Sequence, residues 1–225
     1  MSLKKFFGGG ASAETARSGQ RTTLQGPRVP RHSSGWVALQ QFLATNPGQR
    51  ILDVGPTSPA NINFLTGLGH SVYMADLVED ANSAEYRLAP SNTEEDDEPQ
   101  RYDTARFVAE SVNFAGRDFD VILLWDTLDY LPEPFVAPVV VRLHEVLQPG
   151  GRLLAFFHNE EQGPPETPFS RYHLAAGESV DAQRAAPHRI HAIYSNRAVE
   201  KLFAEFHATR FFLARDKMRE VLVER

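Results

Sequence analysis

The stretch RILDVGPTSP, residues 50–59, decides the fold class. Its first part is a short apolar run that stops at Gly55, which is typical of a buried strand ending at a turn. Ser58 and Pro59 then indicate a helix start, because serine is a preferred N-cap and proline at the first helical position gives up an N–H that would be unpaired anyway. The stretch therefore predicts a strand, a tight turn and a helix in direct succession.

The same alternation of strand and helix patterns continues along the rest of the chain. The predicted strands are 50–55, 70–76, 118–125, 152–157, 209–214 and 219–223. The predicted helices lie within 34–46, 58–69, 138–147 and 195–206, with a helix or a helix and a strand at 101–114. Continuously apolar strands between helices predict a parallel sheet covered on both faces. We therefore expect a doubly wound, Rossmann-like α/β domain whose last two strands, joined by a short turn, make an antiparallel C-terminal end.

Two of these helix predictions name particular residues. Ser34 is expected to cap the first helix, because serine precedes apolar positions at a spacing of three to four residues. Another helix is expected to begin at Pro138, with Val140, Val141 and Leu147 facing the core.

The first 33 residues form a separate, basic segment. They carry a net charge of +5, whereas residues 34–225 carry −11. The segment is rich in Gly, Ser, Arg and Pro and has no helical or strand period, so we expect a flexible tail before one α/β domain over residues 34–225. The alternative that its end, near Arg31 and His32, folds over a ligand site stays open.

The composition argues against several classes of protein. The 225 residues contain no cysteine, which rules out disulfides, iron–sulfur clusters and a thiol nucleophile. The net charge of −6 and the lack of an apolar run of about 20 residues argue against a nucleic-acid partner and a membrane span. The motifs of phosphate-loop, serine-hydrolase and dinucleotide-binding enzymes are missing as well. We expect a cytoplasmic protein without stable membrane association.

Asp76 is the first candidate ligand-binding residue. Ligands of open α/β sheets bind beyond the carboxyl ends of the strands, where the winding direction reverses. Asp76 ends the second predicted strand, 21 residues after Gly55. An acidic side chain at about this distance from a glycine turn is placed to accept hydrogen bonds from both hydroxyls of a ribose. The spacing predicts a nucleoside-containing ligand, with capping of the next helix as the alternative role for Asp76.

Three runs of the sequence follow one another in order: 51–55 with Asp76, then 119–125, then 147–154. Together they resemble the motifs of class I S-adenosylmethionine-dependent methyltransferases. The resemblance implies a seven-stranded, mostly parallel sheet with S-adenosylmethionine as the cofactor. Asp76 would hold its ribose, and Glu110 with Ser111 would meet its adenine. The residues implied for cofactor binding are Asp53, Gly55, Asp76, Leu77, Glu110, Ser111, Leu124, Trp125 and Tyr130.

The first motif departs from the family pattern. Members usually carry Gly-x-Gly-x-Gly, whereas the turn here is GPTSP, residues 55–59, and keeps only the first glycine. Pro56 removes an N–H and Thr57 adds a branched side chain beside the expected ligand. S-adenosylmethionine offers a carboxylate and no phosphate, so the following helix start can still face it. Two functions stay open: methyl transfer to an oxygen or nitrogen of a small-molecule acceptor by in-line displacement, or a non-catalytic domain that binds a ligand or a partner.

The candidate catalytic residues follow the predicted strands 118–125 and 152–157. Asp126 and Asp129 lie three residues apart; a carboxylate there stabilises a sulfonium reactant more than the transition state, which favours orientation or capping roles. His158, directly after the strand 152–157, is the candidate general base. His188 and His191 share no partner acids at ligand spacing, so we expect no metal. The segment 159–194 is expected to cover the acceptor and to determine specificity.

Overall fold

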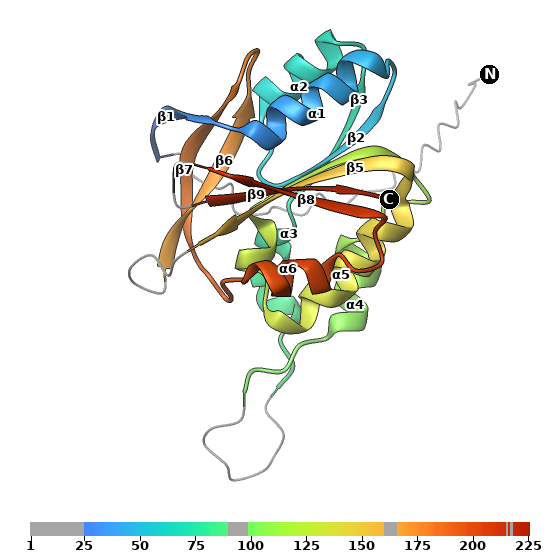
Figure 1. The fold of residues 1–225 in the computed structure, drawn as a ribbon. Helices are drawn as coiled ribbons and strands as arrows, with labels where there is room; N and C mark the ends of the chain where they lie inside the picture. Colours follow the sequence, from blue (N-terminus) through green and yellow to red (C-terminus); the bar gives the residue numbers. More distant parts are fainter. Residues whose placement is uncertain (1–24, 90–98, 160–165, 215, 217) are drawn as a thin grey trace, which may run out of the picture.

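The fold consists of a six-stranded and a three-stranded sheet, with helices on both faces of the larger one (Figure 1). The computed structural model describes residues 25–89, 99–159, 166–214, 216 and 218–225. The strands are β1 Gln25–His32, β2 Arg50–Val54, β3 Ser71–Ala75, β4 Phe119–Trp125, β5 Leu147–His158, β6 Glu166–Leu174, β7 Ser179–Arg189, β8 Ala208–Leu213 and β9 Met218–Glu224. The helices are α1 Ser34–Thr45, α2 Pro59–Gly67, α3 Leu77–Asn82, η1 Ala84–Tyr86, α4 Thr104–Ser111, η2 Thr127–Tyr130, α5 Glu133–Val146 and α6 Asn196–Leu202. Within this described part, no helix is both long enough and apolar enough to cross a membrane.

The central sheet has the strand order β3-β2-β4-β5-β9-β8. Its first four strands run parallel, whereas β9 is antiparallel to both β5 and β8. This arrangement confirms the predicted Rossmann-like, mostly parallel sheet with an antiparallel C-terminal strand. Within the described residues the sheet has six strands and not the seven that the family resemblance implies, because the described chain between β3 and β4 forms only α3, η1 and α4.

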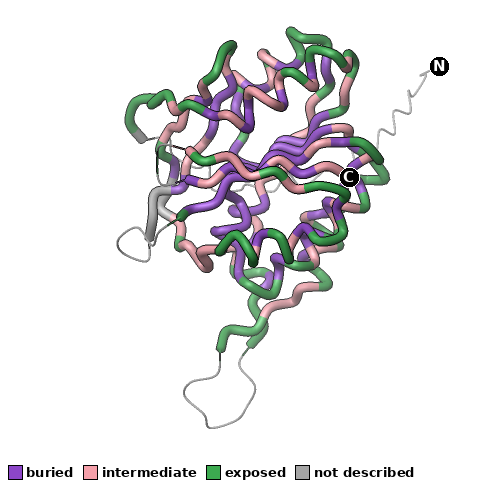
Figure 2. The backbone as a smooth tube through the Cα atoms, viewed as in Figure 1, coloured by how far each residue is buried: buried purple, intermediate pink, exposed green. Residues whose placement is uncertain are grey.

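Helices cover both faces of this sheet, with α1 and α2 on one face and α3 to α6 on the other (Figure 1). On the first face, Trp36 and Leu39 of α1 pack in one apolar cluster with Leu154 of β5. On the other face, Phe107 of α4 stacks on Phe135 of α5 with ring centroids 4.1 Å apart. Figure 2 shows the buried strands between these two layers. The two apolar layers explain why the parallel strands are apolar on both sides.

Serine side chains cap three of the α-helices. Ser58 caps α2 and Ser195 caps α6, and both accept a backbone N–H of the first turn. The cap of α1 is Ser33, whose Oγ accepts from the Trp36 N–H at 3.1 Å. The expected cap, Ser34, is instead the first helical residue, so this boundary differs from the prediction by one position.

Helix α5 begins earlier than the sequence predicts. It starts at Glu133, and Pro138 lies inside the helix instead of opening it. The buried positions follow the helical spacing from residue 135 onwards, which accounts for the earlier start. Val141 lies off this stripe and is 57% exposed, so its predicted inward orientation is wrong. The buried positions are Phe135, Val136, Val139, Val140, Leu143 and Val146.

The smaller sheet has the antiparallel order β1-β7-β6. Strands β6 and β7 come from the segment 159–194, and β1 is the end of the basic N-terminal segment. Residues 25–32 therefore belong to the folded part, although a flexible tail was expected up to residue 33. Residues 1–24 and the acidic run 94–98 lie outside the described residues.

Candidate active site

Strands β2, β3 and β4 end side by side at one edge of the central sheet. The Gly55 N–H, just after β2, donates to the carbonyl oxygen of Ala75 at 2.7 Å. The Thr127 hydroxyl, just after β4, donates to the carbonyl oxygen of Val54 at 3.1 Å. These bonds keep the three strand ends together beyond the ladder itself. The structure thus brings the predicted residues at the three strand ends to one edge, which we call the carboxyl edge.

Trp125 closes the carboxyl edge between β2 and β4. A Cβ at Gly55 would lie 3.3 Å from Cδ1 of this indole, so glycine allows the close approach. Trp125 itself has a φ of 51°, a left-handed conformation that costs a bulky residue about 1–3 kcal/mol and is common at functional sites. Its ring stacks on Tyr172 of β6, with centroids 5.0 Å apart and an interplanar angle of 15°. The small sheet therefore helps to hold the strained conformation.

Asp53 is turned into the protein interior. Its Oδ1 accepts from Nε1 of Trp125 at 2.6 Å, and its Oδ2 accepts from Nδ2 of Asn61 at 2.8 Å. Burial raises the pKa of Asp53 to about 6, although both hydrogen bonds oppose the shift. With both oxygens engaged, Asp53 positions Trp125 and the start of α2.

Asn61 joins three parts of the site. Besides Asp53, its Nδ2 donates to the carbonyl oxygen of Tyr172 at 3.2 Å, and its Oδ1 accepts from the Leu174 N–H at 2.6 Å. Asn61 is 1% exposed, so these groups have no access to bulk water. One side chain in α2 thereby attaches β6 to the carboxyl edge.

We expect Asn61→Ala to lower the free energy of unfolding by about 3 kcal/mol, because it leaves a buried N–H and a buried carboxylate oxygen without partners. Urea denaturation followed by circular dichroism measures the effect. Asn63→Ala, at an exposed position of the same helix, is the control and should change stability by less than about 0.5 kcal/mol. Equal effects of the two variants would contradict the attachment role.

Asp76 lies at the carboxyl end of β3 and caps α3. Its Oδ1 accepts from the Glu79 N–H at 3.3 Å, so the alternative role in helix capping is observed. The other oxygen has no hydrogen bond to the described residues. Burial raises the pKa of Asp76 to about 6, although the guanidinium of Arg171 opposes the shift. Leu77 is fully buried beneath it.

Three residues predicted to bind the cofactor lie away from Asp76 or point elsewhere. Glu110 and Ser111 end α4, where both contact the Tyr86 hydroxyl, and Glu110 also accepts from Nε of Arg106 at 3.0 Å. Ser111 is followed by the short link to the amino end of β4. Leu124 faces the core cluster of the α3–α6 side. The role of these three residues in binding the cofactor stays a prediction.

His158 and Asp129 form a buried pair at the ends of β5 and η2. Oδ2 of Asp129 accepts from both the backbone N–H and Nδ1 of His158, each at 2.7 Å. Burial alone would lower the pKa of His158, but the hydrogen bond to Asp129 and the nearby carboxylate of Asp126 raise it. Asp129 thus stabilises a protonated imidazole and fixes its orientation.

Four buried polar atoms near the carboxyl edge have no hydrogen-bond partner among the described residues: Oδ1 of Asp126, Oδ1 of Asp129, the hydroxyl of Tyr130 and Nε of Arg171. The other Asp126 oxygen accepts from the Tyr172 hydroxyl at 3.0 Å. Burial raises the pKa of Asp126 to about 6. Because buried polar groups in proteins are nearly always paired, such a concentration indicates a place for a polar ligand.

The carboxyl edge fits S-adenosylmethionine in its chemistry. Asp76 offers a partly exposed carboxylate with one oxygen free for ribose hydroxyls, which would stabilise its ionised form. Arg171 offers an unpaired buried N–H, and the amino end of α2 offers a positive dipole toward a carboxylate. Within the described residues, no three His, Cys, Asp or Glu side chains are grouped to hold a metal ion.

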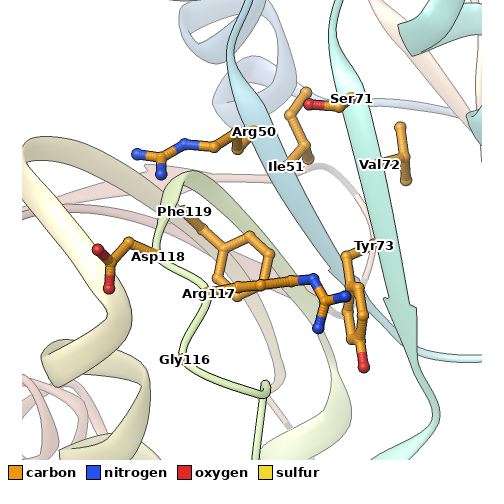
Figure 3. A pocket seen from close by; sticks show the side chains of 9 residues that line it. All are labelled: Arg50, Ile51, Ser71, Val72, Tyr73, Gly116, Arg117, Asp118 and Phe119. Atoms are coloured by element: carbon orange, nitrogen blue, oxygen red, sulfur yellow. The ribbon is translucent and has the colours of Figure 1, made fainter.

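A separate pocket of about 330 Å³ lies at the opposite edge of the sheet (Figure 3). It is lined at the amino ends of β2, β3 and β4, where the Arg117 guanidinium lies 5.0 Å from the centroid of the Tyr73 ring. It includes none of the predicted site residues.

Sequence reasoning missed the contribution of β6 to the site. Arg171, Tyr172 and His173 all contact or face the carboxyl edge, and Nδ1 of His173 lies 2.8 Å from Oγ of Ser58. No local pattern marks these residues, because their role depends on a strand pairing that brings β6 to residues more than 100 positions earlier.

The chain belongs to the methyltransferase domain family, whose model matches residues 33–208. This match confirms the resemblance to S-adenosylmethionine-dependent methyltransferases and the enzyme class that it implies. No curated protein matches the sequence.

Similar solved structures include a 1,6-didemethyltoxoflavin N1-methyltransferase of Burkholderia thailandensis with bound 1,6-didemethyltoxoflavin and S-adenosylhomocysteine. It shares 15% identity over 85% of this chain and 76% of that one, with a TM-score of 0.45. A methyltransferase of Methanosarcina mazei shares 15% identity over 84% and 96%, with a TM-score of 0.46. One from Aquifex aeolicus shares 17% identity over 84% and 88%, with a TM-score of 0.45.

Proposed function

We propose that this protein transfers a methyl group from S-adenosylmethionine to an oxygen or nitrogen atom of a small-molecule acceptor. The observation that carries the proposal is the partly exposed carboxylate of Asp76 at the carboxyl edge, beside the turn that starts α2, where one oxygen caps α3 and the other has no hydrogen bond to the described residues. A ribose presents two hydroxyl donors, which suit such a carboxylate.

The residues around Asp76 divide the binding work. Gly55 leaves room for the Trp125 indole at the turn, and the fully buried Leu77 anchors the start of α3, which Asp76 caps, in the core. Trp125 and Tyr130 line the side where the methyl group would be presented. Glu110 and Ser111 remain predictions for the adenine, and Asp53 acts through Trp125 and Asn61.

S-adenosylmethionine supplies an activated methyl group, so the protein chiefly positions the acceptor and takes up its proton. His158 is the proposed base. Its Nδ1 donates to Asp129, which leaves Nε2 to accept a proton from the acceptor. Asp129 then stabilises the imidazolium that forms, because its carboxylate is held 2.7 Å away.

Calorimetric titration with S-adenosylhomocysteine between about pH 5 and 8 tests the donor site. The carboxyl of Asp76 has a raised pKa of about 6 and takes up a proton below it. Ribose hydroxyls bind the ionised form, so the affinity should be constant above about pH 7 and fall by about tenfold per pH unit well below pH 6. The absence of binding by the folded protein at pH 7.5 would contradict the proposal.

A further inference from the structure

Three buried hydrogen-bond acceptors lie in or next to the turn η2, directly after β4. They are Oδ1 of Asp126, Oδ1 of Asp129 and the hydroxyl oxygen of Tyr130, and none has a partner among the described residues. The three side chains are 1%, 0% and 0% exposed. Side chains three residues apart eclipse in a 3-10 helix, which puts Asp126 and Asp129 on one face of η2, and the Tyr130 ring packs against the His158 ring that Asp129 holds. Burial, and then the charges of Asp126 and Asp129, also raise the pKa of the Tyr130 hydroxyl.

The charge of this cluster is not balanced by the cations near it. Asp129 is paired with His158, whereas Asp126 accepts a hydrogen bond only from the neutral Tyr172 hydroxyl among the described contacts. Arg31 is paired with Asp216 and Glu220. Arg219 donates to the carbonyl oxygen of Tyr194, and its charge also acts against the rise that burial causes in the pKa of Asp129. With His158 neutral, as its role as the base requires, the charges of Asp126 and Asp129 together exceed that of Arg219 once Asp126 is ionised.

Aromatic rings surround the same place. Tyr130 packs edge-to-face against Phe169 with centroids 4.8 Å apart, and against the His158 ring at 5.8 Å. The Tyr172 hydroxyl donates to Oδ2 of Asp126, so a third aromatic side chain adjoins this carboxylate. Ring faces attract cations, and they do so most strongly where water is excluded. Carboxylates within an aromatic enclosure thus favour a cationic group that donates hydrogen bonds.

We propose that Asp126, Asp129 and Tyr130 bind the acceptor as a primary ammonium ion, so that the enzyme methylates a primary amine. This inference rests on the proposed function and specifies its acceptor. An ammonium group has three N–H donors, and the cluster has three unpaired acceptors. A neutral hydroxyl has one donor and would leave two buried oxygens unpaired.

Methyl transfer in this complex removes one proton from the nitrogen and adds one methyl group to it. One proton leaves the ammonium nitrogen for Nε2 of His158, and the freed lone pair forms the nitrogen–carbon bond. The methyl carbon–sulfur bond breaks, and its electron pair stays on sulfur. The protonated product has two N–H donors, one fewer than the three acceptors accommodate, so a single methylation is expected.

Calorimetry with three probes that share one ring tests the acceptor class: benzylamine, benzyl alcohol and benzoate, at about pH 8, with and without saturating S-adenosylhomocysteine. At this pH the amine is protonated and Asp126, with a pKa of about 6, is ionised. Benzylamine should bind at least about tenfold more tightly than benzyl alcohol, and benzoate should not bind measurably.

Two variants tie the binding to the cluster. Asp126→Asn keeps the shape of the side chain and an acceptor for the Tyr172 hydroxyl. It should lower the affinity for benzylamine about tenfold or more, while the affinity for S-adenosylhomocysteine stays the same. Tyr130→Phe keeps the ring and should lower the affinity for benzylamine by at least about threefold. Asp118→Asn, an exposed acid at the amino end of β4, is the matched control and should change neither ligand.

The outcomes separate the two proposals. Equal binding of benzylamine and benzyl alcohol, or benzylamine binding that is unchanged in both variants, overturns the amine assignment and indicates that water fills the cluster; the proposed function stands if S-adenosylhomocysteine still binds. Failure of the folded protein to bind S-adenosylhomocysteine overturns the proposed function and the inference with it.

Discussion

Asp76→Asn is expected to weaken the binding of S-adenosylhomocysteine by about 100-fold. Two ribose hydroxyls would donate to the carboxylate, and hydrogen bonds to a charged group contribute about 1.5–3 kcal/mol each. An asparagine amide presents its own N–H donors to one of these hydroxyls and carries no charge. The fold should persist, because asparagine is as good an N-cap as aspartate and can still accept from the Glu79 N–H.

Asp103→Asn is the matched control for this experiment. Asp103 caps α4 in the same way, with Oδ1 accepting from the Arg106 N–H at 3.0 Å, but it is not at the carboxyl edge. Its replacement should leave the affinity unchanged. The pH dependence of binding below pH 6 should also disappear in Asp76→Asn and persist in Asp103→Asn. An affinity within about threefold of the unmodified protein in Asp76→Asn would show that this carboxylate does not hold the ligand.

Glu220→Gln is expected to lower the free energy of unfolding by about 3 kcal/mol. Glu220 is 1% exposed; its Oε2 accepts from the Gly35 N–H at 2.7 Å, and its Oε1 lies 2.9 Å from the Arg31 guanidinium. Removing one partner of a buried ion pair leaves an uncompensated charge, which costs about 3–5 kcal/mol. Asp216, which also contacts Arg31, retains part of the pairing, so the lower value applies.

The same strand provides the control for Glu220. Glu224 of β9 pairs with Arg152 at 3.1 Å, and both side chains are partly exposed. Glu224→Gln should lower the free energy of unfolding by less than about 1 kcal/mol. Equal urea midpoints for the two variants would mean that the contact between Arg31 of β1 and Glu220 does not stabilise the fold.

The core of the fold is predictable from the sequence because its signals are local. The apolar run of β4 and the Ser58-Pro59 helix start each depend on a few adjacent residues, and both are found where they were predicted. Pro138 misled the prediction, since proline marks helix starts on average but here lies within α5. The segment of β6 and β7 shows no clear alternation, so its strands depend on contacts distant in sequence.

The site was predictable in part for the same reason. Asp76 follows from its distance to Gly55, and His158 from its place at the end of β5. The pairing of His158 with Asp129 spans 29 residues, and no spacing rule connects them. Asp53 was predicted to bind the ligand, whereas the side chains of Asn61 and Trp125 use both of its oxygens. Which polar atoms remain unpaired becomes known only when the packing is complete.

A crystal structure of the protein with S-adenosylhomocysteine tests the central claim most directly. The account predicts that both ribose hydroxyls lie within hydrogen-bonding distance of Asp76 and that the sulfur atom lies on the side of Trp125 and Tyr130. A ligand bound away from the ends of β2, β3 and β4, or a carboxyl edge left empty at saturating ligand, would contradict it.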